Sequence, residues 1–553
     1  MHPKFTKLFC QVLMTIFSTV PTLLAAPVLV QTIDFSGAGG SPGMRFGDIT
    51  GDGRLEMIVG QPMPQSDFDS HTPQEVGRVT AYSIVTGKQL WQYTRPGNPK
   101  LGTSASSDVP IQVYDWDGDG VSEVIAAFSR TEFTFLDGLT GKVKRTIPIP
   151  QGTSARGASG SNDCVIIANL RGTPWPQDFI VKTRYTQVWG IDGRDGKVLW
   201  GPFKGTGDNL AHFGYVYDVD GDGRDEYLSG HQLHSPTGEV LWKVSGLQLH
   251  LDAAAIGDID GDPTNGKEFV LGSNIGACVR GRTGEVLWRD TKSGTVEIQQ
   301  MGVGDFLPNR PGLETVVLDR IGPRDNSGID ANVLLSSTGA LIWREKPDPA
   351  SGWVTVTEKL SNWDGTGKDF IFSYRRTSAG PAIFEATEDK QVMVAEFKRM
   401  SYDIGMHANL CGDDKEEVVI YDTRQALVYA NGGCDLEAPM APQPQNRRHY
   451  NWSIYTGWED KDYTFFTPGQ TSLIKQYTPK IRFHIQQGNG LVQFKDLQPS
   501  SSLKIWDTRG TLVSQSGIIH SGEWVTERKL KQGVYLIQAT QGSQTAFRKL
   551  AVK

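Results

Sequence analysis

Histidine and cysteine are scarce in this chain, and so are helical patterns. Only 10 of the 553 residues are histidine and 5 are cysteine, so neither a zinc finger nor a dense disulfide framework is expected. A Cys411–Cys434 bridge is compatible with an oxidising compartment, but spacing alone does not establish it. Basic tracts are also missing and the formal charge is −7, which argues against nucleic acid as a partner.

Long apolar runs are confined to the start of the chain. Residues 1–26 contain Lys4 and Lys7, an apolar stretch from Leu8 to Val20, and small residues at 25 and 26. This order predicts a secretory signal peptide, because the apolar stretch is too short to span a bilayer. We therefore expect a secreted or cell-surface protein with no transmembrane span.

The strongest motif is an acidic loop. Asp218-Val-Asp-Gly-Asp-Gly-Arg-Asp-Glu226 has carboxylates at positions 1, 3 and 5, a glycine at 6 and an acid at 9. Oxygen ligands two residues apart in a tight turn point to one centre, which suits Ca²⁺. A strand-like run follows instead of a helix, so the motif predicts a calcium-type loop between two strands and not an EF-hand.

The loop recurs eight times. The copies start at residues 48, 115, 169, 218, 258, 305, 362 and 409, most of them about 50 residues apart. A period of this length is typical of a propeller or a solenoid. Four copies have the strongest ligand pattern, and we expect Ca²⁺ on the following residues: Asp48, Thr50, Asp52, Glu56, Asp115, Asp117, Asp119, Glu123, Asp218, Asp220, Asp222, Glu226, Asp258, Asp260, Asp262 and Glu268.

A second motif repeats with about the same spacing as the acidic loops. A Thr-Gly or Asp-Gly turn precedes an alternating apolar run that ends in tryptophan, and the tryptophans are Trp91, Trp200, Trp242, Trp288 and Trp343. Such turns favour hairpins, so each unit is expected to hold four antiparallel strands, with its tryptophan packed between neighbouring units. Eight units predict an all-β fold, an eight-bladed β-propeller.

The pattern changes toward the C-terminus. We assign residues 27–470 to the propeller and expect residues 449–458, after a Pro-rich connection, to complete its final blade. Residues 476–553 contain short alternating strands that predict a small β-sandwich. Its segments Asp507-Thr-Arg-Gly, Gly533-Val-Tyr-Leu and Lys549-Leu-Ala-Val-Lys553 resemble the sorting domains of the type IX secretion class, which implies contact with secretion machinery or attachment to the cell surface. A generic carbohydrate-binding or spacer module is the alternative.

The order of motifs in residues 160–460 resembles the rhamnogalacturonan lyases of polysaccharide lyase family 11. The resemblance rests on six segments: Asp178-Phe-Ile-Val-Lys-Thr-Arg184, Tyr217-Asp-Val-Asp-Gly-Asp-Gly-Arg-Asp-Glu226, His250-Leu-Asp-Ala-Ala-Ala-Ile-Gly-Asp258, Phe306-Leu-Pro-Asn-Arg-Pro-Gly-Leu-Glu314, Trp363-Asp-Gly and Asn409-Leu-Cys-Gly-Asp-Asp-Lys-Glu-Glu-Val-Val419. It implies a secreted eight-bladed propeller with calcium in its loops. The implied activity is cleavage of an acidic polysaccharide, the rhamnogalacturonan backbone of pectin, by calcium-assisted β-elimination.

A lyase of this kind needs three groups. The carboxylate beside the weakly acidic C5 proton must be neutralised, a base must take the proton, and a donor must protonate the leaving oxygen. Lysine, tyrosine and histidine suit the base role once their surroundings shift the pKa. Four of the ten histidines fall between residues 212 and 250, and the candidate catalytic residues are Lys182, Arg184, His212, His231 and His250.

Three alternatives remain open at this point. His212 and His231 flank the strongest acidic loop, which is compatible with an ulvan lyase-type propeller that uses paired histidines. The acidic loops alone are also compatible with a non-catalytic, calcium-stabilised propeller that binds glycans or proteins, as in integrin-type repeats. The tryptophan repeat also occurs in quinoprotein propellers, but those lack acidic loops on this pattern.

Overall fold

The computed structural model describes most of the propeller and parts of the C-terminal region. The described residues are 26–36, 43–64, 75–102, 109–153, 160–183, 185–204, 210–248, 250–319, 331–345, 356–374, 380–400, 404–438, 447–458, 484–488, 491–495, 501–507, 512–516, 524–526, 530–531, 533–541 and 544–552. The expected signal peptide lies outside them, apart from Ala26, and so does Arg184.

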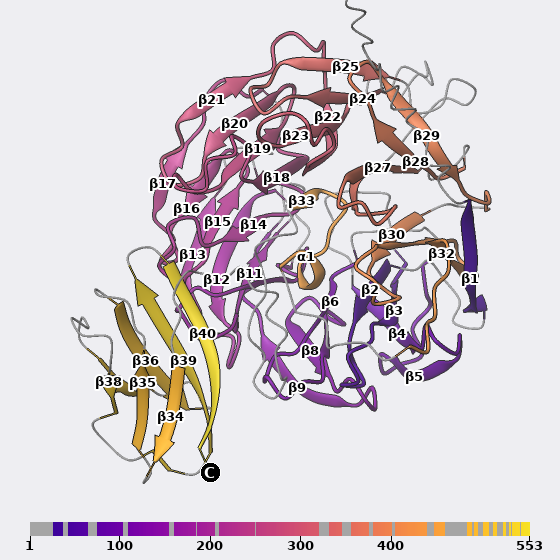
Figure 1. Cartoon of the computed structure of the whole chain (residues 1–553). Helices are drawn as coiled ribbons and strands as arrows, with labels where there is room; N and C mark the ends of the chain where they lie inside the picture. Colours follow the sequence, from indigo (N-terminus) through magenta and orange to yellow (C-terminus); the bar gives the residue numbers. More distant parts are fainter. Residues whose placement is uncertain are drawn as a thin grey trace, which may run out of the picture.

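Eight blades, each of four antiparallel strands, form a ring (Figure 1), and a fifth strand joins the sheet of one blade. Blades 1 to 4 comprise β2 Gly43–Gly47, β3 Glu56–Pro62, β4 Val76–Tyr82 and β5 Gln89–Thr94; β6 Ile111–Tyr114, β7 Glu123–Ala126, β8 Glu132–Leu136 and β9 Val143–Pro148; β10 Ile166–Ala168, β11 Asp178–Lys182, β12 Gln187–Asp192 and β13 Val198–Lys204; β14 Tyr215–Tyr217, β15 Glu226–Ser229, β16 Gln232–His234 and β17 Val240–Lys243. Blades 5 to 8 comprise β18 Ala253–Gly257, β19 Glu268–Gly272, β20 Gly276–Arg280 and β21 Val286–Arg289; β22 Ile298–Gly304, β23 Glu314–Asp319, β24 Ala331–Leu335 and β25 Leu341–Glu345; β26 Val356–Ser361, β27 Asp369–Tyr374, β28 Ala382–Ala386 and β29 Gln391–Glu396; β30 Ile404–Ala408, β31 Glu417–Tyr421 and β32 Gln425–Asn431, with β1 Pro27–Asp34 as the fourth strand. The predicted eight-bladed propeller is confirmed.

The acidic loops define the blade boundaries. Each of the eight predicted loop starts is the residue directly after the first strand of a blade, and each loop-ending acid is the first residue of the next strand. In seven blades this acid accepts a hydrogen bond from the backbone N–H of the second or third loop residue. The acids are Glu56, Glu123, Asp178, Glu226, Glu268, Glu314 and Glu417. Local loop chemistry therefore fixes where each inner strand ends.

The ring closes through the N-terminal strand. β1 pairs antiparallel with β32 in the sheet of blade 8, so both ends of the propeller sequence contribute to one blade. The prediction that residues 449–458 complete the final blade is wrong, because β33 (Thr456–Trp458) pairs in parallel with β18 of blade 5. Together with α1 (Arg447–Tyr450), β33 lies inside the ring (Figure 1), and we name residues 447–458 the channel segment.

The repeated tryptophans join neighbouring blades, as predicted. The indole N–H of each donates to a carbonyl in the hairpin of the following blade, at distances of 2.6 to 3.0 Å. The hairpins that face the first four tryptophans contain a glycine that allows the close approach. A Cβ added at Gly284, for example, would lie 2.5 Å from Cγ of Trp242. Gly284 also has a φ of +69°, a backbone conformation that glycine adopts without steric cost.

The C-terminal region contains two small sheets. One comprises β34 His484–Gly488, β35 Leu491–Lys495 and β38 Trp524–Val525; the other comprises β36 Ser501–Asp507, β37 Leu512–Gln515, β39 Gly533–Gln541 and β40 Gln544–Val552. A disulfide joins Cys411 to Cys434, and Cys164 and Cys278 are buried thiols. Among the described residues, no helix has the length and apolar character to cross a membrane.

Candidate functional site

In the acidic loop that starts at Asp218, the carboxylates of the first, third and ninth loop residues lie close together. In the loop after β14, both oxygens of the Asp218 carboxylate accept backbone N–H groups, from Gly221 at 2.7 Å and Gly223 at 2.9 Å. Ligand oxygens of Asp218, Asp220 and Glu226 lie within 4.8 Å of one another. Burial, followed by the charges of these neighbours, raises the pKa of Glu226 to about 8. A divalent cation would relieve this crowding of acids.

Two further loops have the same convergent triad, and position 5 has another role. The other triads are Asp115, Asp117 and Glu123, and Asp258, Asp260 and Glu268. The fifth-position acids are exposed and accept backbone N–H groups of their own loops: Asp52, Asp119, Asp222 and Asp262. In the first loop, burial and then the charge of Asp48 raise the pKa of Glu56 to about 8. Thr50 lies in the same loop.

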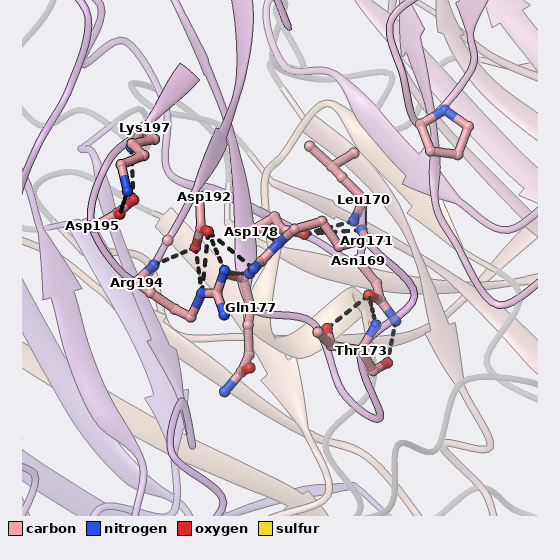
Figure 2. Close-up of polar contacts among 12 residues, drawn as sticks. Asn169, Leu170, Arg171, Thr173, Gln177, Asp178, Asp192, Arg194, Asp195 and Lys197 are labelled. Atoms are coloured by element: carbon pink, nitrogen blue, oxygen red, sulfur yellow. Dashed lines mark hydrogen bonds and ion pairs between the residues drawn. The ribbon is translucent and has the colours of Figure 1, made fainter. Parts of the chain in front are cut away.

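In three of the loops, a lysine or arginine side chain of the protein lies beside the acids. In blade 2, Nζ of Lys144 lies 2.7 Å from Oδ2 of Asp117 and 2.5 Å from Oε1 of Glu123. In blade 3, Arg171 lies 2.7 Å from Asp178 and 3.0 Å from Asp192 (Figure 2). In blade 5, Arg280 lies 3.2 Å from Glu268 and 3.4 Å from Asp260. The acidic loops are therefore not equivalent as metal sites.

A second group of titratable side chains lies at the opposite ends of the inner strands. His212 and Asp252 precede β14 and β18, whereas the acidic loops follow these strands. Six residue steps separate Asp252 from Asp258, which is about 20 Å in extended chain. A cation in an acidic loop is therefore remote from this group.

His212, His250 and Asp252 meet on one carboxylate oxygen. Nε2 of His212 and Nε2 of His250 each lie 2.8 Å from Oδ1 of Asp252. This oxygen is buried between the two imidazoles, whereas Oδ2 accepts a 2.6 Å hydrogen bond from the amide of Gln299. The backbone N–H of His212 donates to the carbonyl of Leu251, which ties the two loops together.

The charge of Asp252 is maintained despite burial. The side chain of Asp252 is 3% exposed, compared with 15% for His212 and 29% for His250. Burial alone would raise the pKa of Asp252, but the two imidazoles outweigh it and hold the pKa below its usual range. Two imidazole nitrogens and a carboxylate oxygen within 4.8 Å of one another are a ligand set typical of divalent transition metals.

Tyr185 completes the group. Its hydroxyl lies 2.8 Å from Nε2 of His212, and its ring centroid is 5.5 Å from that of His250. The φ of Tyr185 is +66°, a left-handed conformation that is uncommon outside glycine and costs on the order of 1–3 kcal/mol. The chain therefore holds a strained tyrosine beside two histidines and a charged aspartate.

The remaining sequence-based candidates lie elsewhere or outside the described residues. Lys182, at the end of β11, is fully buried and forms an ion pair with Asp163, so its ammonium cannot reach a polymer. His231 lies in the turn between β15 and β16 and is not among the residues that these contacts join. Arg184 is outside the described part of the chain.

Sequence reasoning missed two residues of this group. Asp252 is two positions after His250, and a His-x-Asp pair that opens a strand was the available signal. Gln299 offers no such signal, because its contact with Asp252 joins residues 47 positions apart. Tyr185 is suited to proton transfer by residue type, but only the structure places it beside His212.

The chain is similar in sequence to two proteins of Bacillus subtilis (strain 168). It is 25% identical over 435 residues to rhamnogalacturonan endolyase YesW, covering 68% of this chain and 64% of YesW. It is 26% identical over 442 residues to rhamnogalacturonan exolyase YesX, covering 68% of each chain. The match thus spans slightly less than two thirds of the length of YesW. A family profile described as outer membrane protein assembly factor BamB matches residues 70–175.

Solved structures share the propeller fold. The exotype rhamnogalacturonan lyase YesX superimposes with a TM-score of 0.52 at 20% identity, over 80% of this chain and 83% of that chain. A rhamnogalacturonan lyase of Bacillus licheniformis gives 0.51 at 19% identity over the same shares. The V. cholerae biofilm matrix protein Bap1 gives 0.52 at 13% identity, over 77% of this chain and 94% of that chain. At these identities the likeness establishes the fold that the chain shares with them.

Proposed function

We propose that this protein is a secreted polysaccharide lyase that cleaves the rhamnogalacturonan backbone of pectin by β-elimination. The observation that carries the proposal is the group formed by Tyr185, His212, His250 and Asp252 at one face of the ring. Sequence similarity to YesW and YesX supports the substrate class. The apolar start of the chain supports secretion.

The reaction transfers one proton away from carbon and one proton to oxygen. The C5–H bond of the uronate breaks, its electron pair forms the C4–C5 double bond, and the C4–O bond breaks as the leaving oxygen is protonated. The hydroxyl of Tyr185 and the imidazole of His212 lie 2.8 Å apart, which is a distance suited to proton transfer. Asp252 fixes the orientation of both histidines, because one of its oxygens lies 2.8 Å from Nε2 of each.

The substrate carboxylate also requires a positive charge. His212, His250 and Asp252 would hold a divalent metal ion, because one ligand atom of each lies within 4.8 Å of the others. With Nε2 of His212 on the ion, Nδ1 would remain as the nitrogen that faces the hydroxyl of Tyr185, at 3.0 Å. Such an ion would neutralise the uronate carboxylate. We assign Ca²⁺ to the acidic loops instead, where Asp218, Asp220 and their equivalents offer the oxygen ligands that calcium prefers.

The test is the appearance of unsaturated uronate. The full-length protein is incubated with rhamnogalacturonan, homogalacturonan and ulvan, and the ultraviolet absorbance of the double bond is followed. We expect product from rhamnogalacturonan and a loss of at least about 100-fold in His212→Gln and Asp252→Asn. His231→Gln is the matched histidine control and should retain most of the activity. Binding of polymer without product from any substrate would favour the non-catalytic propeller instead.

An ulvan lyase-type activity is the second candidate. One observation favours it, because two histidines share a single carboxylate, although the partner of His212 is His250 and not His231. Product from ulvan together with none from rhamnogalacturonan would decide for this candidate.

A further inference from the structure

The channel segment is held inside the ring by several blades. Asn451 exchanges two 2.7 Å hydrogen bonds with the backbone of Ile167 in blade 3. The amide of Gln112 in blade 2 donates to the carbonyl of Trp452 at 3.2 Å, and the guanidinium of Arg45 in blade 1 lies 4.9 Å from the centre of the Trp452 ring. Contacts with blades 1, 2 and 3 therefore fix the first part of the segment, before the chain reaches blade 5.

The last part of the segment lies against the strand that follows Asp252. The backbone N–H of Ala254 donates to the carbonyl of Tyr455 at 3.1 Å, and β33 continues this pairing along β18. There is no room for a side chain at Gly457, where an added Cβ would lie 2.7 Å from the carbonyl oxygen of Met301. The backbone of Tyr455 is thus fixed relative to the loop that carries Asp252.

The side chain of Tyr455 covers one face of His212. The two rings are stacked, with centroids 4.6 Å apart and an interplanar angle of 14°. Tyr185 approaches His212 from its edge, at 5.1 Å and 83°, and Nε2 faces Asp252. The imidazole is thus held by a stacked ring on one face and by polar contacts at its edge, which restricts rotation about both side-chain torsions.

We infer that Tyr455 is a positioning residue that fixes the imidazole of His212, so that the segment leaving the propeller completes the candidate site from inside the ring. Tyr455 acts through His212 by ring stacking, which phenylalanine can reproduce. The consequence for catalysis rests on the proposed lyase function, whereas the placement of His212 does not.

The first experiment measures the placement directly and requires no lyase activity. The protein is treated with diethyl pyrocarbonate in the presence of a chelator, and modification of each histidine is quantified by mass spectrometry. In Tyr455→Ala we expect His212 to react several-fold faster, while His234, which is buried in blade 4, stays slow. Tyr455→Phe should behave as the wild type. An unchanged rate at His212, or a parallel rise at all histidines, would overturn the inference.

The second experiment measures the effect on catalysis. With rhamnogalacturonan as substrate, Tyr455→Ala should lower kcat by roughly 10- to 100-fold with little change in KM, because a displaced catalytic group costs rate more than binding. Tyr455→Phe should restore kcat. The matched control is Ile454→Val, a neighbouring buried residue of the same segment, which should lower the Tm without changing kcat. Equal loss of kcat in the phenylalanine and alanine variants would contradict positioning by stacking.

Discussion

Lys144 tests whether the acidic loop of blade 2 holds an internal cation in place of Ca²⁺. Its ammonium lies 2.7 Å from Asp117, 2.5 Å from Glu123 and 4.0 Å from Asp119. Glu123 is 3% exposed, so Lys144→Met leaves a buried carboxylate without its partner. Breaking a fully buried pair costs about 3–5 kcal/mol. Because Lys144 is 34% exposed, we reduce the expected loss to roughly 1–3 kcal/mol.

The measurement is the Tm with and without calcium. In a chelator, Lys144→Met should unfold at a lower temperature than the wild type, by on the order of 1 °C per kcal/mol for a domain of this size. In excess Ca²⁺ the variant should gain more than the wild type, since the vacated loop becomes a new site. Binding at 100 times Kd contributes about 2.7 kcal/mol.

Two comparisons make the result decisive. Lys197→Met removes an exposed ion pair with Asp195 and should change neither the Tm in chelator nor the gain with calcium. Asp218→Ala removes a ligand from the loop of blade 4 and should reduce the calcium gain of an otherwise wild-type protein. Equal calcium gains in wild type and Lys144→Met would refute the reasoning, because the ammonium would then not occupy a metal position.

Three further predictions concern the loops, the blades and the candidate site. Burial raises the pKa of Glu417 to about 8 from an ordinary value of 4.5. The folded state therefore retains a proton that the unfolded chain releases, so the free energy of unfolding in chelator should fall between pH 4.5 and pH 8, by roughly 5 kcal/mol at most. Glu417→Gln should flatten this urea-unfolding profile. Gly284→Ala should lower the free energy of unfolding by about 2–3 kcal/mol, because the added methyl group clashes with Trp242. The control Gly294→Ala should lower it by only about 1 kcal/mol, because nothing lies within 4 Å of the added Cβ. Tyr185→Phe should lower kcat on rhamnogalacturonan by about 100-fold, and a variant as active as the wild type would contradict a role for the hydroxyl.

The blade boundaries could be predicted from the sequence because they depend on local chemistry. The first acid of a loop accepts N–H groups three and five residues later, as Asp48 does with Gly51 and Gly53. The ninth residue, here Glu56, accepts the N–H of Ile49. All these contacts lie within one short segment, so the motif itself encodes the end of one strand and the start of the next.

The position of the channel segment could not be predicted in the same way. A strand pattern at residues 456–458 fits antiparallel pairing in a final blade and parallel pairing with β18 equally well. The outcome depends on β1, which pairs with β32 about 400 residues away in the sequence and leaves blade 8 complete. Only the closed ring shows that Trp452 and Tyr455 lie within it.

The surroundings of single charged residues depend on partners that lie far away in the sequence. Lys182 ends a strand of the blade that resembles the lyase pattern, yet its ammonium pairs with Asp163, which lies before the first strand of the same blade. Lys144 has the same relation to Asp117, 27 residues earlier. A lone lysine in the sequence therefore does not reveal whether it faces a substrate, replaces a metal or supports the core. Of the three predicted histidines, the structure brings His212 and His250 together on Asp252, because they lie on the connections before two adjacent blades.

The inner strands connect the acidic loops at one end of each blade to the histidine and aspartate residues at the other end. β14 and β18 are fixed at one end by the loops of Asp218 and Asp258, and at the other end they carry His212 and Asp252. Since a short strand within a blade cannot change length, an ordered acidic loop determines where the residue before the strand lies. Under the proposed function, Ca²⁺ bound in the loops would act about 20 Å from the histidines and would not touch the substrate. Its contribution would be to keep the strands rigid, and the positions of His212 and Asp252 depend on those strands.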